Sequence, residues 1–248
     1  MSHRFVIAPD FPPNLFSGWY TLNTLLQKRS GLAVHLETPA SSAEQADMIA
    51  KGGIDVVYAN PFDAAKMIRE QGYKAIARPV GKSDEMVIVS SAKGDIKTLG
   101  DLKAGASIAM ADNRDVKLIG LRLLEAVDLT EADVKFDITE TYQAAAKQVA
   151  QGTVDAGFFI AEIYHSLSNL TRMQLNVLIE SDLATITHVV LVKEDFADAN
   201  KVRDVLLALK DDADGQAVLA ELGMPQGFEA VNEEEAEFMI DLMETLLD

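Results

Sequence analysis

The chain has 248 residues, of which 48% are hydrophobic and 25% are charged, and 39 acidic against 22 basic side chains give a formal net charge of −17 at pH 7. This is the composition of a folded globular protein, and the excess of acids argues against nucleic acid and anionic membranes as partners, because their phosphate groups repel it. The absence of cysteine excludes a disulfide, a thiolate nucleophile and a cysteine-ligated metal.

The first 72 residues predict three strands that alternate with three helices. Ser41 is placed as the N-cap of the second helix, with Glu44 as its capping-box partner. Asn60 and Pro61 stand where the cap and the first position of the third helix are expected. This alternation indicates a mostly parallel sheet covered by helices. The predicted strands are residues 4–10, 32–39 and 54–60, and the predicted helices are residues 14–28, 41–53 and 61–72.

A second series of alternating strands and helices follows two β-rich runs, at residues 73–81 and 85–91, and a linker. Two more strands and two amphipathic helices complete the chain. The second series consists of strands at residues 107–112, 134–139 and 153–160 and helices at residues 115–127, 142–152 and 161–170. The final elements are strands at residues 175–180 and 187–193 and helices at residues 201–222 and 233–247.

The two series share a short repeated design. In each, an Ala-rich helix ends at glycine, an apolar residue and an aspartate open a strand, and an aromatic residue follows three positions later. The aspartates are Asp55 and Asp155, and the aromatic residues are Tyr58 and Phe158. Two similar α/β lobes account for this repeat more simply than one large sheet does.

Ligands of open α/β sheets bind beyond the carboxyl ends of the strands, so two facing lobes predict a site in the cleft between them. Some of the candidates also have a purely structural explanation. Asn60 and Pro61 form a good helix start, Phe158 belongs to an apolar strand, and Glu162 suits a first helical turn. Arg114 has neighbouring aspartates to pair with. The candidate ligand-binding residues are Asp10, Phe11, Tyr58, Asn60, Pro61, Asn113, Arg114, Thr141, Tyr142, Phe158 and Glu162.

Catalysis has weaker support than binding. The four histidines show no metal-ligand spacing, and the chain has neither a G-x-S-x-G motif nor a glycine-rich phosphate loop. We therefore expect no catalytic residue, no metal and no cofactor.

Four stretches, "GGIDVVYANPFDA", "GYKAIARP", "IKTLGDLKAGASIAMAD" and "QGTVDAG", follow one another as in a known family. From about Arg4 to Lys193 the chain resembles the periplasmic substrate-binding proteins of phosphate, phosphite and phosphonate ABC transporters, the PhnD-like branch of the type II binding-protein fold. The resemblance implies a monomer whose lobes close on a solute and deliver it to an ABC permease or a sensor protein. It also implies crossover strands at residues 85–91 and 187–193. The first lobe is then residues 1–84 and 190–248, and the second, inserted lobe is residues 85–189.

The chain departs from this family where the anion is held. The family's Ser/Thr-rich turn is matched by "DNRDVKL", and its Ser-His-Asp by "TETYQ", which has no histidine. Several acidic residues lie in or near the expected first turns of helices, among them Asp63, Asp112, Asp115 and Glu140. Their negative charges already compensate the helix dipoles that would otherwise favour a bound anion. The sequence therefore predicts a zwitterionic or cationic solute, with Arg114 meeting any oxyanion that it carries.

Two other functions stay open. One is a cytoplasmic effector-binding or sensor module, and the other is an enzyme on the same bilobal scaffold, of the kind used for menaquinone or thiamin precursors. No apolar run approaches the roughly 20 residues that span a bilayer, and the first residues lead directly into a strand. We expect a periplasmic protein if an export signal has been removed, and a cytoplasmic one otherwise.

Overall fold

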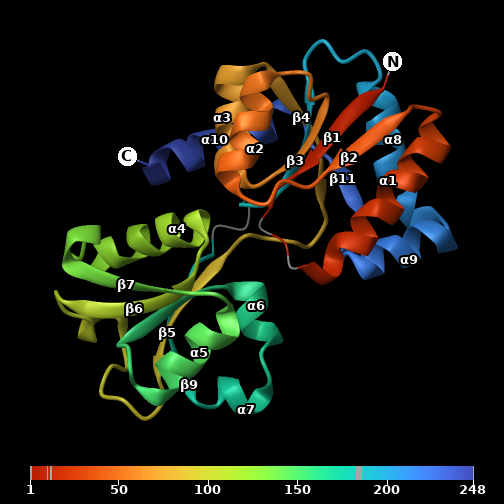
Figure 1. Ribbon diagram of the computed structural model, residues 1–248. Helices are drawn as coiled ribbons and strands as arrows, with labels where there is room; N and C mark the ends of the chain where they lie inside the picture. The colour runs from red at the N-terminus through yellow and green to blue at the C-terminus, as the bar shows by residue number, and fades with distance from the viewer. Residues whose placement is uncertain (1, 10, 12, 183–185, 248) are drawn as a thin grey trace. The chain divides into compact units, whose positions relative to one another are not determined.

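The computed structural model describes residues 2–9, 11, 13–182 and 186–247 (Figure 1). The chain forms two compact units, each with its own sheet. Unit 1 comprises Met1–Lys82 and Thr187–Glu244, and unit 2 comprises Ser83–Ile186 with the last residues, Thr245–Asp248. The predicted α/β class is confirmed in both units.

Unit 1 is built on a six-stranded sheet. Its strands are β1 (His3–Ile7), β2 (Val34–Glu37), β3 (Val56–Ala59), β4 (Tyr73–Pro79), β10 (Val189–Lys193) and β11 (Phe228–Ala230). Their order is β11-β4-β10-β3-β1-β2. β1 is parallel to β2 and β3, whereas β10 is antiparallel to both β3 and β4, and β11 is antiparallel to β4. The sheet is therefore mixed rather than mostly parallel as predicted, because the later strands β10 and β11 join it antiparallel and only β1, β2 and β3 form a parallel part.

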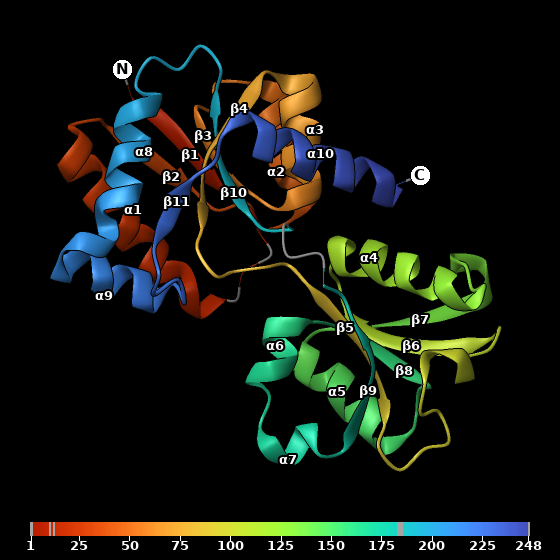
Figure 2. The same ribbon diagram turned by 180° about the vertical axis from the view of Figure 1, so that it is seen from behind.

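Helices cover both faces of this sheet (Figure 2). One face packs against α1, α8 and α9 around Trp19, Leu22, Leu206 and Leu219, and the other packs against α2, α3 and α10. Every residue of β3 is buried, as expected for a strand covered on both faces. The helices are α1 (Phe16–Ser30), α2 (Ser42–Lys51), α3 (Pro61–Gln71), α8 (Ala199–Ala208), α9 (Ala213–Glu221) and α10 (Glu233–Leu247).

Unit 2 has a five-stranded mixed sheet. Its strands are β5 (Met86–Ser91), β6 (Ala106–Ala111), β7 (Val134–Thr139), β8 (Ala156–Ile160) and β9 (Leu175–Glu180), in the order β7-β6-β8-β5-β9. β6 is parallel to β7 and β8, and β5 is antiparallel to β8 and β9. The helix α4 (Arg114–Leu124) covers one face. On the other face lie α5 (Tyr142–Gln151), α6 (Ala161–Ser166) and α7 (Asn169–Arg172) (Figure 1).

The predicted helix over residues 201–222 is wrong in one respect, because the chain turns a corner within it. α8 ends at Ala208, a single 3-10 turn follows, and Asp212 caps α9 by accepting a hydrogen bond from the Gly215 N–H at 2.9 Å. A Cβ at Gly215 would lie 1.9 Å from the Leu209 carbonyl oxygen, so the corner needs glycine there. The predicted helix over residues 161–170 is likewise divided, into α6 and α7, with Ser168 as the second cap.

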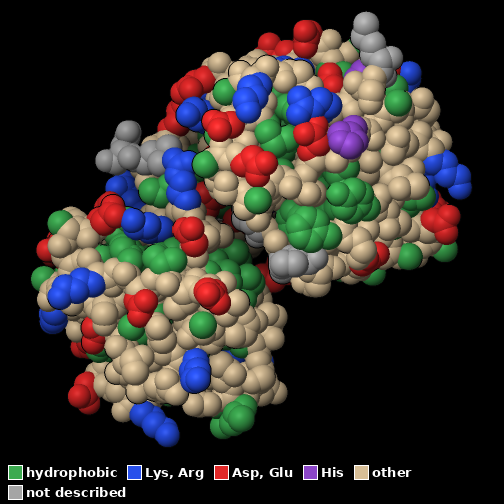
Figure 3. Space-filling view, in the orientation of Figure 1, with side chains coloured by type: hydrophobic (Ala, Val, Ile, Leu, Met, Phe, Trp, Pro, Cys, Tyr) green, Lys and Arg blue, Asp and Glu red, His purple; other side chains and the backbone are tan. Residues whose placement is uncertain are grey.

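Charged side chains of both signs are scattered over the face drawn in Figure 3. None of the helices in the described part of the chain combines the length and apolar character that a bilayer-spanning segment needs.

Candidate functional site

The carboxyl ends of β1 and β3 bring several predicted residues together in unit 1. The Ala8 N–H donates to the Tyr58 carbonyl at 2.8 Å, which joins the two strand ends. Asn60 then caps α3, with its Oδ1 accepting from the Asp63 N–H at 2.8 Å and its Nδ2 donating to the Asp63 carboxylate at 3.1 Å. Pro61 occupies the first helical position, as predicted. The local sequence thus places a helix N-terminus at this edge.

Five rings in contact lead to this edge, and we call them the aromatic series. Phe16 lies 5.1 Å from Phe11, Phe11 lies 6.1 Å from Trp19, and Trp19 lies 4.7 Å from Tyr58, as distances between ring centroids. Tyr58 stacks on His188 at 5.1 Å with an interplanar angle of 24°. Phe16 is 40% exposed and Tyr58 is 7% exposed. The series therefore runs from the surface of unit 1 to the end of β3.

The carboxyl edge of unit 2 is formed by the ends of β6, β7 and β8, which are hydrogen-bonded neighbours. The Asn113 Oδ1 accepts from the Val116 N–H at 3.0 Å and caps α4, and the Thr141 hydroxyl accepts from the Ala144 N–H at 3.2 Å and caps α5. Arg114, at the first position of α4, is exposed. Two helix N-termini and one guanidinium thus lie at one edge, an arrangement suited to an oxyanion.

Two buried carboxylates accompany this arrangement in unit 2. Asp115, in the first turn of α4, is 9% exposed, and Glu85, directly before β5, is 7% exposed. Glu85 lies beside the end of β8, because its carbonyl accepts from the Ala161 N–H at 2.8 Å. The Ser181 hydroxyl donates to the Glu85 carboxylate and accepts from the Met86 N–H at 2.9 Å. Buried carboxylates are costly unless a charge or hydrogen bonds compensate them, and the Ser181 hydroxyl supplies one such bond to Glu85. Glu85 and Asp115 thus add negatively charged side chains to this edge.

Sequence reasoning did not select Glu85 or Ser181 as site residues. Glu85 had one available signal, since it is an acid directly in front of β5, a strand that is buried throughout. Ser181 had none, because only the pairing of β5 with β9 brings its hydroxyl to Glu85.

The other predicted residues have different surroundings. Phe158 is completely buried, with its ring 5.8 Å from that of Phe136, and so belongs to the core of unit 2. Tyr142 is half-buried, with its ring 5.9 Å from that of Phe159, and Glu162 is exposed in the first turn of α6. Asp10 lies outside the described residues. Ligand contact by any of these residues stays a prediction.

The hydroxyl of Tyr164, on α6 of unit 2, has a shifted pKa. Burial raises the pKa of Tyr164 in α6 above its ordinary value, the Arg172 guanidinium opposes this shift, and the Glu180 carboxylate adds to it. The ring of Tyr164 lies 6.5 Å from that of Phe159. Its hydroxyl therefore stays protonated at neutral pH and remains a hydrogen-bond donor.

The sequence profile of a family described as "ABC transporter, phosphonate, periplasmic substrate-binding protein" matches residues 5–236. No curated protein sequence matches the chain at a significant level. The family match covers both units and nearly every element described above.

Solved structures with the same fold include three binding proteins. A binding protein component of an ABC phosphonate transporter from Pseudomonas aeruginosa is 18% identical with a TM-score of 0.72, covering 100% of this chain and 89% of its own. PhnD1 from Prochlorococcus marinus, in complex with methylphosphonate, is 14% identical with a TM-score of 0.79, covering 99% and 98%. The periplasmic aliphatic sulphonate binding protein SsuA from Escherichia coli is 18% identical with a TM-score of 0.67, covering 99% and 91%.

Proposed function

The chain belongs to the periplasmic substrate-binding proteins of phosphonate ABC transporters, in their PhnD-like branch, and from this premise we propose that it captures a small polar solute for an ABC permease. The solute binds at the carboxyl edges of the two sheets, and closure of the units holds it. The role is binding rather than catalysis. The lobes that close are residues 1–84 with 190–248 and residues 85–189, in a monomer.

We further propose that the solute is a zwitterion with an oxyanion at one end and an ammonium group at the other. The observation that carries this proposal is a pair of buried carboxylates at the carboxyl edge of unit 2, Asp115 in the first turn of α4 and Glu85 beside the start of α6. The helix N-termini and Arg114 suit a phosphonate or sulfonate group. The two carboxylates suit an ammonium group.

The aromatic series supports the same class of solute from unit 1. The rings of Tyr58 and His188 lie at the end of β3, where an aromatic face adds to the attraction of a cation or of a short alkyl chain. The phosphonate and sulfonate ligands named for the similar structures carry the oxyanion that Arg114 would meet. An aminoalkyl phosphonate or aminoalkyl sulfonate satisfies both halves of the proposal.

Isothermal titration calorimetry tests the ligand class with matched pairs: 2-aminoethylphosphonate against ethylphosphonate, and taurine against ethanesulfonate. We expect the zwitterion of a pair to bind at least about tenfold more tightly, a difference of about 1.4 kcal/mol. Glu85→Gln and Asp115→Asn should each reduce this preference, whereas Asp137→Asn, on the exposed side of β7, should not. Micromolar binding of ethylphosphonate and ethanesulfonate without preference for the amine would overturn the zwitterion.

Native mass spectrometry of the gently purified chain tests the binding role without a chosen ligand. A retained solute of small mass, lost on denaturation, is the expected result. A chain that carries no solute and binds none of the four titrated compounds would contradict the proposed role as well as the ligand class.

A further inference from the structure

An uncharged groove of about 460 Å³ lies along the outer edge of the unit 1 sheet, between α1 and β2. None of the described residues that line it is Asp, Glu, Lys or Arg, although a quarter of the chain is charged. Its volume is within the range of small-molecule sites, roughly 300–1,000 Å³. The polar lining residues are Ser2, Tyr20, Asn23, Thr24, Gln27 and His35.

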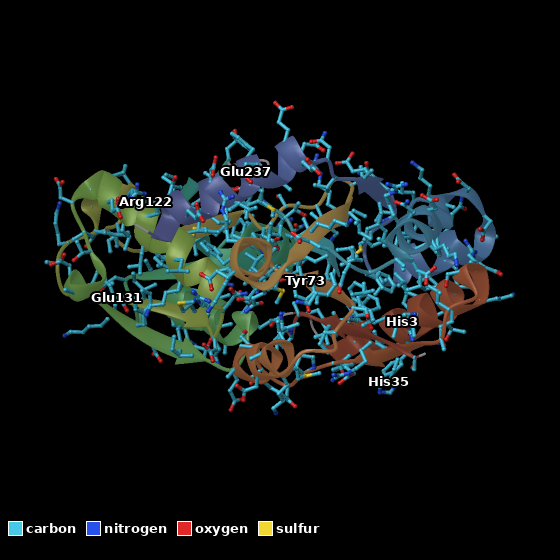
Figure 4. All side chains as sticks on the ribbon, turned by 90° about the horizontal axis from the view of Figure 1, so that it is seen from above. His3, His35, Tyr73, Arg122, Glu131 and Glu237 are labelled. Atoms are coloured by element: carbon cyan, nitrogen blue, oxygen red, sulfur yellow. The ribbon has the colours of Figure 1, made fainter. Side chains whose placement is uncertain are left out.

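The groove lies away from the proposed solute site. Its β2 residues begin at Val34, which pairs with His3 at the amino end of β1, whereas Tyr58 pairs with Ile7 at the carboxyl end. Figure 4 labels His35 on β2 and His3 on the neighbouring strand. A ligand in this groove therefore lies at the outer edge of the sheet, where β1 separates β2 from Tyr58 on β3.

Two side-chain amides of α1 occupy the backbone hydrogen-bonding groups at the outer edge of the sheet, so that a further strand cannot pair there. The Asn23 Nδ2 donates to the Val34 carbonyl at 3.1 Å, and the Gln27 Oε1 accepts from the Val34 N–H at 3.3 Å. These are the two backbone groups that an added strand would use at this position. The groove is therefore poorly suited to an extended peptide, and a small molecule fits it better.

The groups that remain in the groove are neutral and separated from one another. Asn23 is 6% exposed, and its buried Oδ1 has no hydrogen-bond partner among the described residues. This oxygen is enclosed, so Asn23 holds the sheet edge through its Nδ2 and does not offer a contact to a molecule in the groove. The Thr24 hydroxyl donates to the Tyr20 carbonyl at 2.9 Å and keeps its acceptor lone pairs. Tyr20 is 53% exposed, which leaves its ring accessible.

We propose that this groove is a second ligand site, which binds a neutral polyhydroxylated molecule of the mono- or disaccharide class. Each hydroxyl of such a ligand donates and accepts, so it matches the isolated polar groups on Thr24 and Gln27. Its apolar face covers the ring of Tyr20. A nucleobase fits less well, because it needs a free donor and acceptor side by side on one amide, and the amides of Asn23 and Gln27 are already engaged with Val34.

The test is a titration of the whole ¹⁵N-labelled chain, followed by two-dimensional NMR. The probes are D-glucose and maltose up to about 50 mM, because a shallow site with few contacts binds weakly. Glycerol and adenosine are the comparison ligands. We expect saturable shifts for the sugars that are confined to residues 20–27 and 33–36.

Variants assign the shifts to the groove. Tyr20→Ala should weaken sugar binding about tenfold, while Tyr20→Phe, which keeps the ring, should retain it. Phe238→Ala removes an exposed ring elsewhere in unit 1 and should change nothing. Shifts that grow linearly as with glycerol, saturation by adenosine but not by sugars, or equal losses in Tyr20→Ala and Phe238→Ala would each overturn the proposal. None of these outcomes depends on which solute binds near Tyr58 or Arg114.

Discussion

Asp55 and Asp155 make the same pair of hydrogen bonds in the two units. The Asp55 N–H donates to the Arg4 carbonyl at 3.1 Å, and the Asp55 carboxylate accepts from the Arg4 N–H at 3.0 Å. In unit 2 the Asp155 N–H donates to the Ser107 carbonyl at 3.0 Å, and its carboxylate accepts from the Ser107 N–H at 2.8 Å. Each aspartate thus ties the start of one strand to the start of its parallel neighbour, which is the structural reason for the repeated sequence.

Replacing either aspartate by alanine should destabilise its unit by about 1–2 kcal/mol, because backbone N–H groups then lose a charged acceptor. Urea unfolding followed by far-ultraviolet circular dichroism measures the loss for Asp55→Ala and Asp155→Ala. The single tryptophan, Trp19, lies in unit 1, so its fluorescence reports the Asp55 variant separately. Asp137→Ala, an exposed aspartate on β7, is the control. If all three variants unfold alike, the shared bonds do not stabilise the units.

Gly120→Ala should destabilise unit 2 by about 1–3 kcal/mol through overpacking. A Cβ on Gly120 would lie 2.2 Å from the Phe158 ring, so α4 would have to move away from the sheet. The companion variant Phe158→Leu makes room for the methyl group. In urea unfolding the double variant should be more stable than the sum of the two single losses predicts. Additive losses would mean that the two side chains do not meet.

Arg69 on α3 binds three acids along α10, and removing it should loosen that helix in a salt-dependent way. Its guanidinium nitrogens lie 2.6 Å from Glu237, 2.9 Å from Asp241 and 3.1 Å from Glu244, and Figure 4 labels Glu237. Arg69→Met should lower the melting temperature at low ionic strength. The difference should shrink in about 1 M salt, where the screening length falls to about 3 Å.

The matched control for this variant is Arg122→Met, because Arg122 on α4 pairs at 2.7 Å with Glu125, the residue directly after the same helix. Differential scanning calorimetry of the three proteins at two salt concentrations gives the comparison. A loss for Arg69→Met that is equal at both concentrations would show that the side chain acts through packing rather than charge.

Glu37 should stabilise unit 1 at neutral pH and lose this effect in acid. The hydrogen bond from the Arg4 guanidinium lowers the pKa of Glu37 below its ordinary value. A lowered folded-state pKa means that the stabilisation is complete above the unfolded-state pKa, about 4.3, and disappears as the pH falls through the folded-state value. For this partly exposed pair we expect roughly 0.5–1 kcal/mol.

The measurement is urea unfolding of the unmodified chain and Glu37→Gln between about pH 7 and pH 3. The difference between them should be largest at neutral pH and approach zero at the acid end. Glu70→Gln, an exposed glutamate on α3, should follow the unmodified chain throughout. A difference that grows toward acid would contradict the sign of the effect.

Local features were predictable because neighbouring residues decide them. Ser41 accepts from the Glu44 N–H at 3.2 Å as its cap position implies, and Asn60 with Pro61 starts α3 as expected. The Glu44 carboxylate bonds to the Ala40 N–H at 2.7 Å, one residue before the expected partner. The helix caps Asn113 and Thr141 follow from the same short-range rules. The parts of the candidate site that rest on helix starts could therefore be read from the sequence.

Features that depend on distant parts of the chain were not predictable. The buried state of Glu85 requires the pairing of β5 with β9, and the break after Ala208 depends on the close approach of Gly215 to Leu209. Phe158 and Tyr58 occupy matching places in the repeat, yet Phe158 meets Gly120 of α4, whereas Tyr58 meets the ring of Trp19 on α1. Strand β11 is three residues long and, among the described strands, pairs with β4 alone, so it is too short to show a sequence periodicity.

Because β10 lies between β3 and β4, the two sheets cannot be completed at the same stage of synthesis. All strands of the unit 2 sheet come from one continuous stretch of chain, so this sheet can be completed once residue 180 has emerged from the ribosome. The sheet of unit 1 lacks its middle strand until residue 193 has emerged. More than a hundred residues separate β10 from β3 and β4 in the sequence. Strand pairing over such a separation forms slowly. We therefore expect the inserted unit to mature first, and the unit that contains the N-terminus to be the one that depends on chaperones during synthesis.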